Sequence, residues 1–279
     1  MNTLKLKQVL AATLMSLATI SGANAGALYL GGWDTGQVYE VDLDTQAVTS
    51  IASGFSLITG MEGIGNDLYA YDQRTGVVTQ IDPSNGSTIT TYNLGGLVSG
   101  EGTFAMGPDL KGFTSSSSGA TGTYYTFDLI AGTSTNIGTG ISFDGVDFAP
   151  NGVLYGLTQS SSTPGGSQLH TIDPVTGATT LIGSTGISGG SLSGLVVAEG
   201  DFIAAIGDSL YQIDPLTAAA TFLFNPGIGN ISGAAFLGST NPGEPPVDPP
   251  GNPIPEPANL ILLGLGLVAL GYSRKKLNC

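Results

Sequence analysis

The stretch Leu169-His-Thr-Ile-Asp-Pro-Val-Thr-Gly177 sets the organisation of this 279-residue chain. A short apolar strand runs into an Asp-Pro-x-Thr-Gly turn, and a second strand, residues 178–183, follows. Looser copies lie at Val38–Asp42, Val78–Asp82, Tyr125–Asp128 and Leu210–Asp214. The aspartates at 42, 82, 128, 173 and 214 are spaced by 40, 46, 45 and 41 residues. This period is typical of the four-stranded blade of a β-propeller.

The number of blades follows from two independent markers. Five aspartates end the repeated strand, and five small-residue–glycine pairs open a unit. The pairs are Thr59-Gly60, Ser99-Gly100, Asp144-Gly145, Ser193-Gly194 and Ser232-Gly233. The body begins at Ala27–Leu30, which matches a second strand, and ends at Ile231–Leu237, which matches a first strand. We therefore predict an all-β, five-bladed propeller over residues 26–240, closed by pairing of the terminal strands of the body, because this pairing removes two exposed edges.

The repeated turn has a physical explanation that needs no function. The aspartate carboxylate can accept hydrogen bonds from backbone N–H groups two residues on, proline fixes φ, and glycine accepts a positive φ. We therefore expect the five aspartates to form turns and not to act as catalysts.

Charge and cysteine content exclude several classes of function. The chain contains 7 basic and 21 acidic residues, and all acidic residues lie between Asp34 and Glu256. Between the terminal segments, only Arg74 and Lys111 are basic. Because acidic residues greatly outnumber basic ones, the body repels phosphate backbones. We therefore expect no nucleic acid as a partner. The single cysteine, Cys279, is the last residue, which excludes disulfides and thiolate metal sites in the body.

Residues 1–25 have the pattern of a secretory signal peptide with a short helix. Lys5 and Lys7 supply a positive segment, and residues 9–20 are apolar. Ala23 and Ala25 form a small-x-small cleavage site, which predicts a mature chain beginning at Gly26. At the other end, residues 241–253 are a proline-rich linker that we expect to be extended.

The C-terminal segment, residues 254–279, has three parts in a fixed order. Pro255, Glu256 and Pro257 precede an apolar run at 258–272, which we expect to form a short hydrophobic helix. A basic cluster of Arg274, Lys275 and Lys276 follows. This order resembles the PEP-CTERM sorting signal of exported bacterial proteins. The body likewise resembles the β-propeller domains found between a signal peptide and such a tail.

The resemblance implies a route and a set of partners. An exosortase-type protease would recognise Pro255-Glu256-Pro257 and remove the tail after transient anchoring in the inner membrane. The protein would then reach the cell surface or the extracellular space, where such proteins are associated with exopolysaccharide and biofilm matrix. An ordinary C-terminal anchor, with the tail retained, is the alternative.

Candidate chemistry in the body is sparse. His170 is the only histidine and lies within a repeated strand, so we expect it to be a packing residue. Glu62 and Asp147 follow the glycine of a first strand by two residues, and Glu101 does so by one. First strands line the central channel of a propeller, so these carboxylates could form a cation site, with calcium as the candidate ion, or an acid–base pair for glycoside hydrolysis. They could equally point into water at the channel mouth.

The pattern as a whole favours an exported protein without catalytic activity. We expect a binding or structural module that acts on the cell surface or in the matrix, with polysaccharide or a matrix protein as its partner. A carbohydrate-active enzyme or a calcium-dependent lectin that uses the channel carboxylates is the alternative. A spacer without a ligand is the third hypothesis.

Overall fold

A computed structural model describes residues 27–72, 74–94, 101–118, 120–158, 163, 165–188, 193–198 and 201–238. The chain divides into two units, Met1–Glu244 and Pro245–Cys279. The predicted signal segment, the proline-rich linker and the C-terminal hydrophobic helix lie outside the described residues. Within the described ranges, no helix has the length and apolar character needed to cross a membrane.

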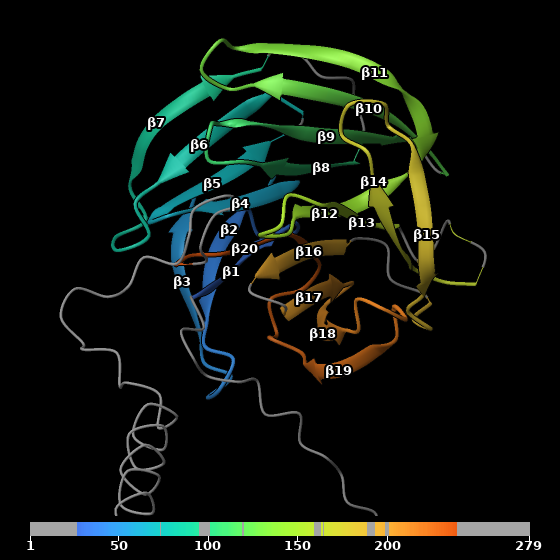
Figure 1. Ribbon diagram of the computed structural model, residues 1–279. Coiled ribbons are helices and arrows are strands. Elements are labelled where there is room, and N and C mark those ends of the chain that lie inside the picture. Colours follow the sequence, from blue (N-terminus) through green and yellow to red (C-terminus); the bar gives the residue numbers. More distant parts are fainter. Residues whose placement is uncertain are drawn as a thin grey trace, which may run out of the picture. The chain divides into compact units, whose positions relative to one another are not determined.

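In this part of the chain, twenty strands form five four-stranded antiparallel sheets around a common centre (Figure 1). The prediction of an all-β, five-bladed propeller is confirmed. From the centre outward, blade 1 consists of β20 (Ile231–Phe236), β1 (Leu28–Gly32), β2 (Gln37–Val41) and β3 (Val48–Ser53). Blade 2 consists of β4 (Gly60–Ile64), β5 (Asp67–Asp72), β6 (Val77–Ile81) and β7 (Thr88–Asn93).

The other three blades repeat this order along the chain. Blade 3 consists of β8 (Glu101–Met106), β9 (Lys111–Ser118), β10 (Thr121–Asp128) and β11 (Thr133–Ile141). Blade 4 consists of β12 (Phe143–Phe148), β13 (Leu154–Thr158), β14 (Gln168–Ile172) and β15 (Thr179–Ser184). Blade 5 consists of β16 (Ser193–Ala198), β17 (Asp201–Ile206), β18 (Ser209–Ile213) and β19 (Ala220–Phe224).

Blade 1 combines strands from the two ends of the propeller sequence. β20 pairs with β1 in antiparallel register, with Leu28 opposite Phe236 and Leu30 opposite Ala234. The register shifts between Gly31 and Gly32. The inner edge of β1 therefore carries a partner strand and is not left open to association with another chain.

The turn between the third and fourth strands of each blade uses its aspartate as expected. Asp173 Oδ1 accepts hydrogen bonds from the N–H groups of Val175 (2.8 Å) and Thr176 (3.2 Å). Asp214 Oδ1 accepts the corresponding pair, from Leu216 and Thr217. These hydrogen bonds hold the pKa values of the turn aspartates below their usual range.

The apolar core lies between blades. Between blades 2 and 3, for example, Tyr71, Phe104 and Phe127 stack with ring centroids 5.1 and 5.0 Å apart. Between blades 3 and 4, Tyr124 stacks on Phe143. Because each sheet is covered on both faces, the inner strands are apolar on both sides and lack strict polar alternation.

Blade 3 opens three residues later than the sequence suggests. A Cβ on Gly60 would meet Phe104, and a Cβ on Gly145 would meet Leu195. Phe104 thus occupies the place that Leu195 has in blade 5, directly after the opening glycine. Thr103 stands where the other blades have glycine, whereas Ser99 and Gly100 lie outside the described residues. Because this place holds a threonine and not a glycine, the sequence did not indicate where β8 begins its match to the other inner strands.

Candidate functional site: the channel carboxyl pair and the groove between blades 3 and 4

Glu62 and Asp147 occupy matching places on two inner strands, β4 and β12. Each follows the opening glycine of its strand by two residues, as the sequence indicated. Glu62 is only 9% exposed and Asp147 only 6%. The two side chains are therefore buried, and they do not point into bulk water at a channel mouth.

Both carboxyl groups bind backbone N–H groups of the next blade. Glu62 Oε2 accepts a hydrogen bond from Met106 N in β8 at 2.9 Å, and Oε1 accepts one from Gly63 N at 3.0 Å. Asp147 Oδ2 accepts a hydrogen bond from Val197 N in β16 at 2.6 Å. Each carboxyl group thus connects its own inner strand to the inner strand of the following blade.

The two carboxyl groups also contact each other, although their blades are not adjacent. A hydrogen bond joins their side chains. Burial, followed by the charge of Asp147, raises the pKa of Glu62 well above its usual value. Burial raises the pKa of Asp147 to about 7. The pair therefore holds at least one proton near neutral pH, as expected for two carboxyl groups that share a dry site.

The other blades contribute no further carboxyl group at this level. Ala105, Val196 and Ala235 stand at the matching places of blades 3, 5 and 1, and all three are buried. Glu101 is the first residue of β8, and its side chain lies outside the described residues. The structure thus brings Glu62 and Asp147 together and leaves the side chain of Glu101 undescribed.

This geometry constrains the chemistry of the pair. Calcium takes about six to eight oxygen ligands, whereas three of these four carboxyl oxygens already accept hydrogen bonds from N–H donors. Within the described ranges, no group of three or more His, Cys, Asp or Glu side chains could hold a metal ion. Glycosidases separate their two carboxyl groups by roughly 5 Å or more, whereas these two are in hydrogen-bond contact.

His170 is buried in the core between blades 3 and 4. Its ring packs edge-on against Phe143, with centroids 5.7 Å apart, and neither ring nitrogen has a hydrogen-bond partner in the described part of the chain. Burial lowers its pKa, so the imidazole is neutral at pH 7. His170 therefore packs as the sequence suggested.

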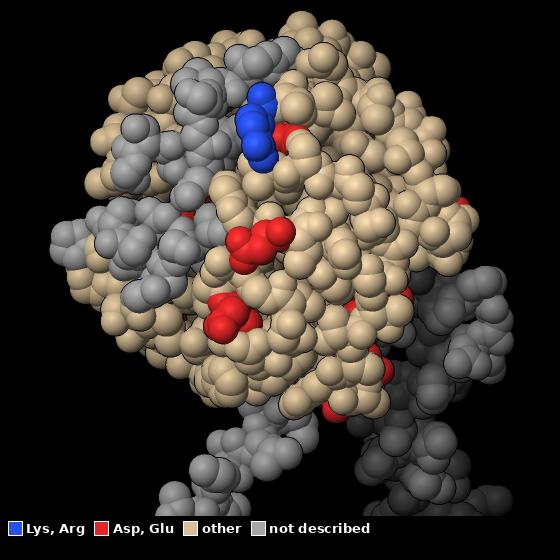
Figure 2. Space-filling view, turned by 180° about the vertical axis from the view of Figure 1, so that it is seen from behind, with Lys and Arg blue, Asp and Glu red and all other residues tan. Residues whose placement is uncertain are grey.

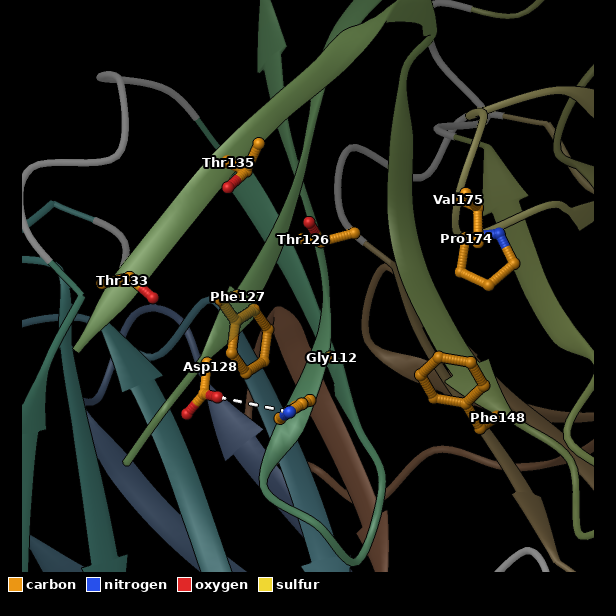
Figure 3. Close-up of a pocket in the computed structure, with 10 residues that line it drawn as sticks. Gly112, Thr126, Phe127, Asp128, Thr133, Thr135, Phe148, Pro174 and Val175 are labelled. Carbon is orange, nitrogen blue, oxygen red and sulfur yellow. Dashed lines mark ion pairs between the residues drawn. The ribbon is translucent and has the colours of Figure 1, made fainter. Parts of the chain in front are cut away.

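A second site, which the sequence did not reveal, is a groove of about 390 Å³ between blades 3 and 4 (Figure 3). One wall comes from blade 3 and carries the hydroxyl groups of Thr126, Thr133 and Thr135. The other wall comes from blade 4 and consists of Phe148, Pro174 and Val175. Sequence reasoning missed it because each wall comes from a different blade, and only the five-fold arrangement brings them together.

An ion pair lies on the blade 3 side of this groove. Lys111 Nζ is 3.5 Å from Asp128 Oδ2, and the dashed line in Figure 3 marks this contact. Asp128 Oδ1 accepts a hydrogen bond from Ala131 N at 2.9 Å, which holds the turn. That hydrogen bond, aided by the charge of Lys111, lowers the pKa of Asp128. The carboxylate is therefore ionised at neutral pH, with one oxygen directed to the lysine.

Comparison with known proteins supports both the fold and the tail. The PEP-CTERM protein-sorting motif matches residues 253–275, so the chain carries this motif and the predicted resemblance is confirmed. The motif implies an exported protein that is transiently anchored in the membrane and processed by an exosortase. No curated protein matches the chain in sequence.

Similar folds occur among solved structures. A chain from the crystal structure of a nidogen/laminin complex is 12% identical, with a TM-score of 0.50 over 75% of this chain and 97% of that chain. TolB from Acinetobacter baumannii is 15% identical, with a TM-score of 0.43 over 71% of this chain and 52% of that chain. At 12% identity, the likeness to the nidogen/laminin chain extends to the fold alone.

Proposed function

We propose that the exported protein is a non-enzymatic module of the cell surface or extracellular matrix that associates with exopolysaccharide in a biofilm. The observation that carries this proposal is that the two channel carboxyl groups are buried and already hydrogen-bonded within the protein. Glu62 and Asp147 are two of the three acidic residues, with Glu101, that the sequence indicated for catalysis. Three of the four carboxyl oxygens of this pair accept hydrogen bonds from backbone N–H groups. A substrate or attacking water has no place between two carboxyl groups that bind each other.

The outer strands support association with sugar. β7, with the sequence Thr-Ile-Thr-Thr-Tyr-Asn, is largely exposed, and the outer strands of blades 3 and 4 also present threonine and serine side chains. Much of the surface seen in Figure 2 consists of uncharged residues, with few basic or acidic patches. Faces that are rich in hydroxyl groups and carry few charged side chains suit the hydroxyl groups of polysaccharides.

The termini provide the route to this location. In this proposal the signal peptide is removed after Ala25, and an exosortase-type protease acts at Pro255-Glu256-Pro257 while the apolar segment and the cluster Arg274, Lys275 and Lys276 anchor the precursor in the inner membrane. The proline-rich linker at 241–253 separates the propeller from the membrane during this step.

Co-sedimentation with exopolysaccharide purified from the producing bacterium tests the proposal. We expect the purified protein to pellet with the polysaccharide equally well with and without EGTA, and to release no reducing ends over a long incubation. Release of reducing ends that disappears in a folded Asp147→Asn variant would establish the carbohydrate-active enzyme instead. Binding abolished by EGTA and restored by calcium would establish the calcium-dependent lectin.

A further inference from the structure

The groove between blades 3 and 4 has two walls of different chemistry. Thr126 faces Thr135, and Asp128 faces Thr133, across the pairing of β10 with β11. Lys111 continues the second row, because it pairs with Asp128 across β9 and β10. Since side chains of directly paired residues share one face of a sheet, a row of hydroxyl and charged groups faces blade 4.

The hydroxyl groups on this wall are available. Within the described residues, no hydrogen bond engages the side chains of Thr126, Thr133 or Thr135, and all three residues are partly or fully exposed. Asp128 Oδ2 and Lys111 Nζ add an acceptor and a donor beside them. This wall can therefore both donate and accept hydrogen bonds over a short distance.

The opposite wall is apolar and rigidly placed. Phe148 ends the inner strand β12 and packs against the core between blades 3 and 4. Val175 is 77% exposed at the tip of its turn, where its N–H is held by Asp173. The same turn packs closely against blade 3, because a Cβ added to Gly177 would lie 2.8 Å from Cδ2 of Tyr124. The width of the groove is thus fixed by contact between the blades.

An amphipathic ligand fits this pair of walls. A pyranose ring has apolar C–H groups on its faces and hydroxyl groups around its edge, so it can stack on Phe148, Pro174 and Val175 while its hydroxyls meet blade 3. The volume of about 390 Å³ lies at the small end of the range for ligand pockets, roughly 300–1,000 Å³. The groove therefore suits a short segment of a glycan.

Charge selects among glycans. Asp128 neutralises Lys111, so the groove offers no unpaired cation to an acidic sugar. The rest of the body is acidic, and Arg74 is its only other basic residue. Uronates and sulfated or phosphorylated sugars are therefore repelled at long range and gain no compensating ion pair.

We propose that this groove binds a neutral pyranose unit of a polysaccharide, and this assignment rests on the proposed function. The rings stack on the blade 4 wall, the hydroxyl groups bind the threonines of blade 3, and the Asp128–Lys111 pair accepts from and donates to vicinal hydroxyls. The site forms a non-covalent complex and performs no chemical step.

Two matched pairs of variants test the assignment in the full-length protein. Val175→Asp places a carboxylate on the apolar wall, and Leu216→Asp makes the same change at the same turn position of blade 5, where Leu216 is 85% exposed and its N–H is held at the same 2.8 Å. Lys111→Met removes the donor from the groove, and Arg74→Met removes the other basic residue of the body. None of these side chains is buried, so all four variants are expected to fold.

Binding is measured by nuclear magnetic resonance titration with neutral di- to tetrasaccharides of glucose, galactose, mannose and N-acetylglucosamine, and with oligogalacturonate as the acidic probe. We expect at least one neutral oligosaccharide to shift the backbone resonances of Thr133, Thr135 and Val175. We expect Val175→Asp and Lys111→Met to weaken that binding at least tenfold, whereas Leu216→Asp and Arg74→Met leave it unchanged. Oligogalacturonate is expected to cause no shift.

The outcomes separate the groove from the proposed function. If the protein pellets with native exopolysaccharide but Val175→Asp and Leu216→Asp behave alike, the groove assignment is wrong and the proposed function stands. Tighter binding of oligogalacturonate than of the neutral probes overturns the neutral-sugar specificity. If the protein binds neither the native polysaccharide nor any oligosaccharide, both proposals fall.

Discussion

The carboxyl group of Glu62 on blade 2 is hydrogen-bonded to that of Asp147 on blade 4, and blade 3 lies between their two blades in the ring. Each group also accepts a hydrogen bond from the inner strand of the following blade, at Met106 and Val197. Two acids thus link four of the five inner strands at one level of the channel. This arrangement ties the stability of the ring to the protonation of a single buried pair.

The first prediction concerns pH. In the folded protein the pKa of Asp147 is raised to about 7 and that of Glu62 is raised well above its usual value, whereas both titrate near pH 4 in an unfolded chain. The folded state therefore binds more protons, and stability falls as pH rises from about 4 to about 7. We expect the free energy of unfolding to drop by roughly 2–4 kcal/mol across this window.

Other titrating groups define the control for this measurement. Turn aspartates such as Asp173 have lowered pKa values, so they contribute stability that is lost only when the pH falls below about 4. His170 has a lowered pKa, so its contribution to stability increases as the pH rises toward about 6.5. This effect opposes that of the carboxyl pair. Urea unfolding of Asp147→Asn beside the wild type between pH 4.5 and 8 isolates the pair. A wild-type slope that Asp147→Asn leaves unchanged would contradict the prediction.

The second prediction concerns the links between blades. Glu62→Ala leaves the buried N–H group of Met106 and the half-buried N–H group of Gly63 without their acceptor, which costs roughly 1–3 kcal/mol for a fully buried group and less for a half-buried one. We expect a loss of about 2–4 kcal/mol, measured by chemical denaturation at pH 6. Glu40→Ala, on the half-buried strand β2, is the control and should cost less than about 0.5 kcal/mol. Equal losses in the two variants would show that the channel hydrogen bonds add nothing.

Local chemistry explains which parts of this structure the sequence could predict. The turn aspartates were identifiable because their partners are local. Asp173 accepts hydrogen bonds from N–H groups two and three residues further on, within the repeated sequence itself. The channel places of Glu62 and Asp147 followed from their distance to an opening glycine. In blade 3 the same rule failed because Thr103 replaces that glycine. The predicted opening of the blade, at Gly100, was therefore three residues too early.

Contacts between distant blades were beyond sequence reasoning. Nothing local to Glu62 indicates that Met106 and Asp147 will face it, because those neighbours depend on how much each blade rotates relative to the last. The groove was missed for the same reason, since Thr135 and Val175 belong to separate sheets. Repeats in sequence therefore predict the blades well and the chemistry between blades poorly.

The third prediction uses two turn glycines with similar backbone conformations. Gly86 and Gly152 have φ values of +72° and +81°, so an alanine at either position costs roughly 1–2 kcal/mol for the left-handed conformation. A Cβ on Gly86 would also collide with the carbonyl oxygen of Ile51 in blade 1, whereas one on Gly152 meets nothing within 4 Å. We expect Gly86→Ala to lower the unfolding free energy by about 1–3 kcal/mol more than Gly152→Ala does. If the two variants lost the same stability in thermal denaturation, the close approach of Gly86 to the Ile51 carbonyl would not limit how blades 1 and 2 pack.

The fourth prediction concerns the tail. The sorting motif covers residues 253–275 and implies processing by an exosortase. In the proposed function this protease recognises Pro255-Glu256-Pro257 and removes the residues that follow. We expect intact mass spectrometry of the protein from the producing bacterium to find a chain that begins at Gly26 and lacks residues beyond the Pro-Glu-Pro segment.

A matched pair of variants makes this test specific. Glu256→Gln alters the acidic residue of the motif, whereas Glu244→Gln alters a glutamate beside proline in the linker, outside residues 253–275. The first should accumulate in the inner-membrane fraction with its tail intact, because the apolar run and the basic cluster still hold the precursor there. The second should be processed like the wild type. Recovery of wild-type protein that ends at Cys279 would instead establish a retained membrane anchor, and the propeller would then act while tethered to the membrane by its proline-rich linker.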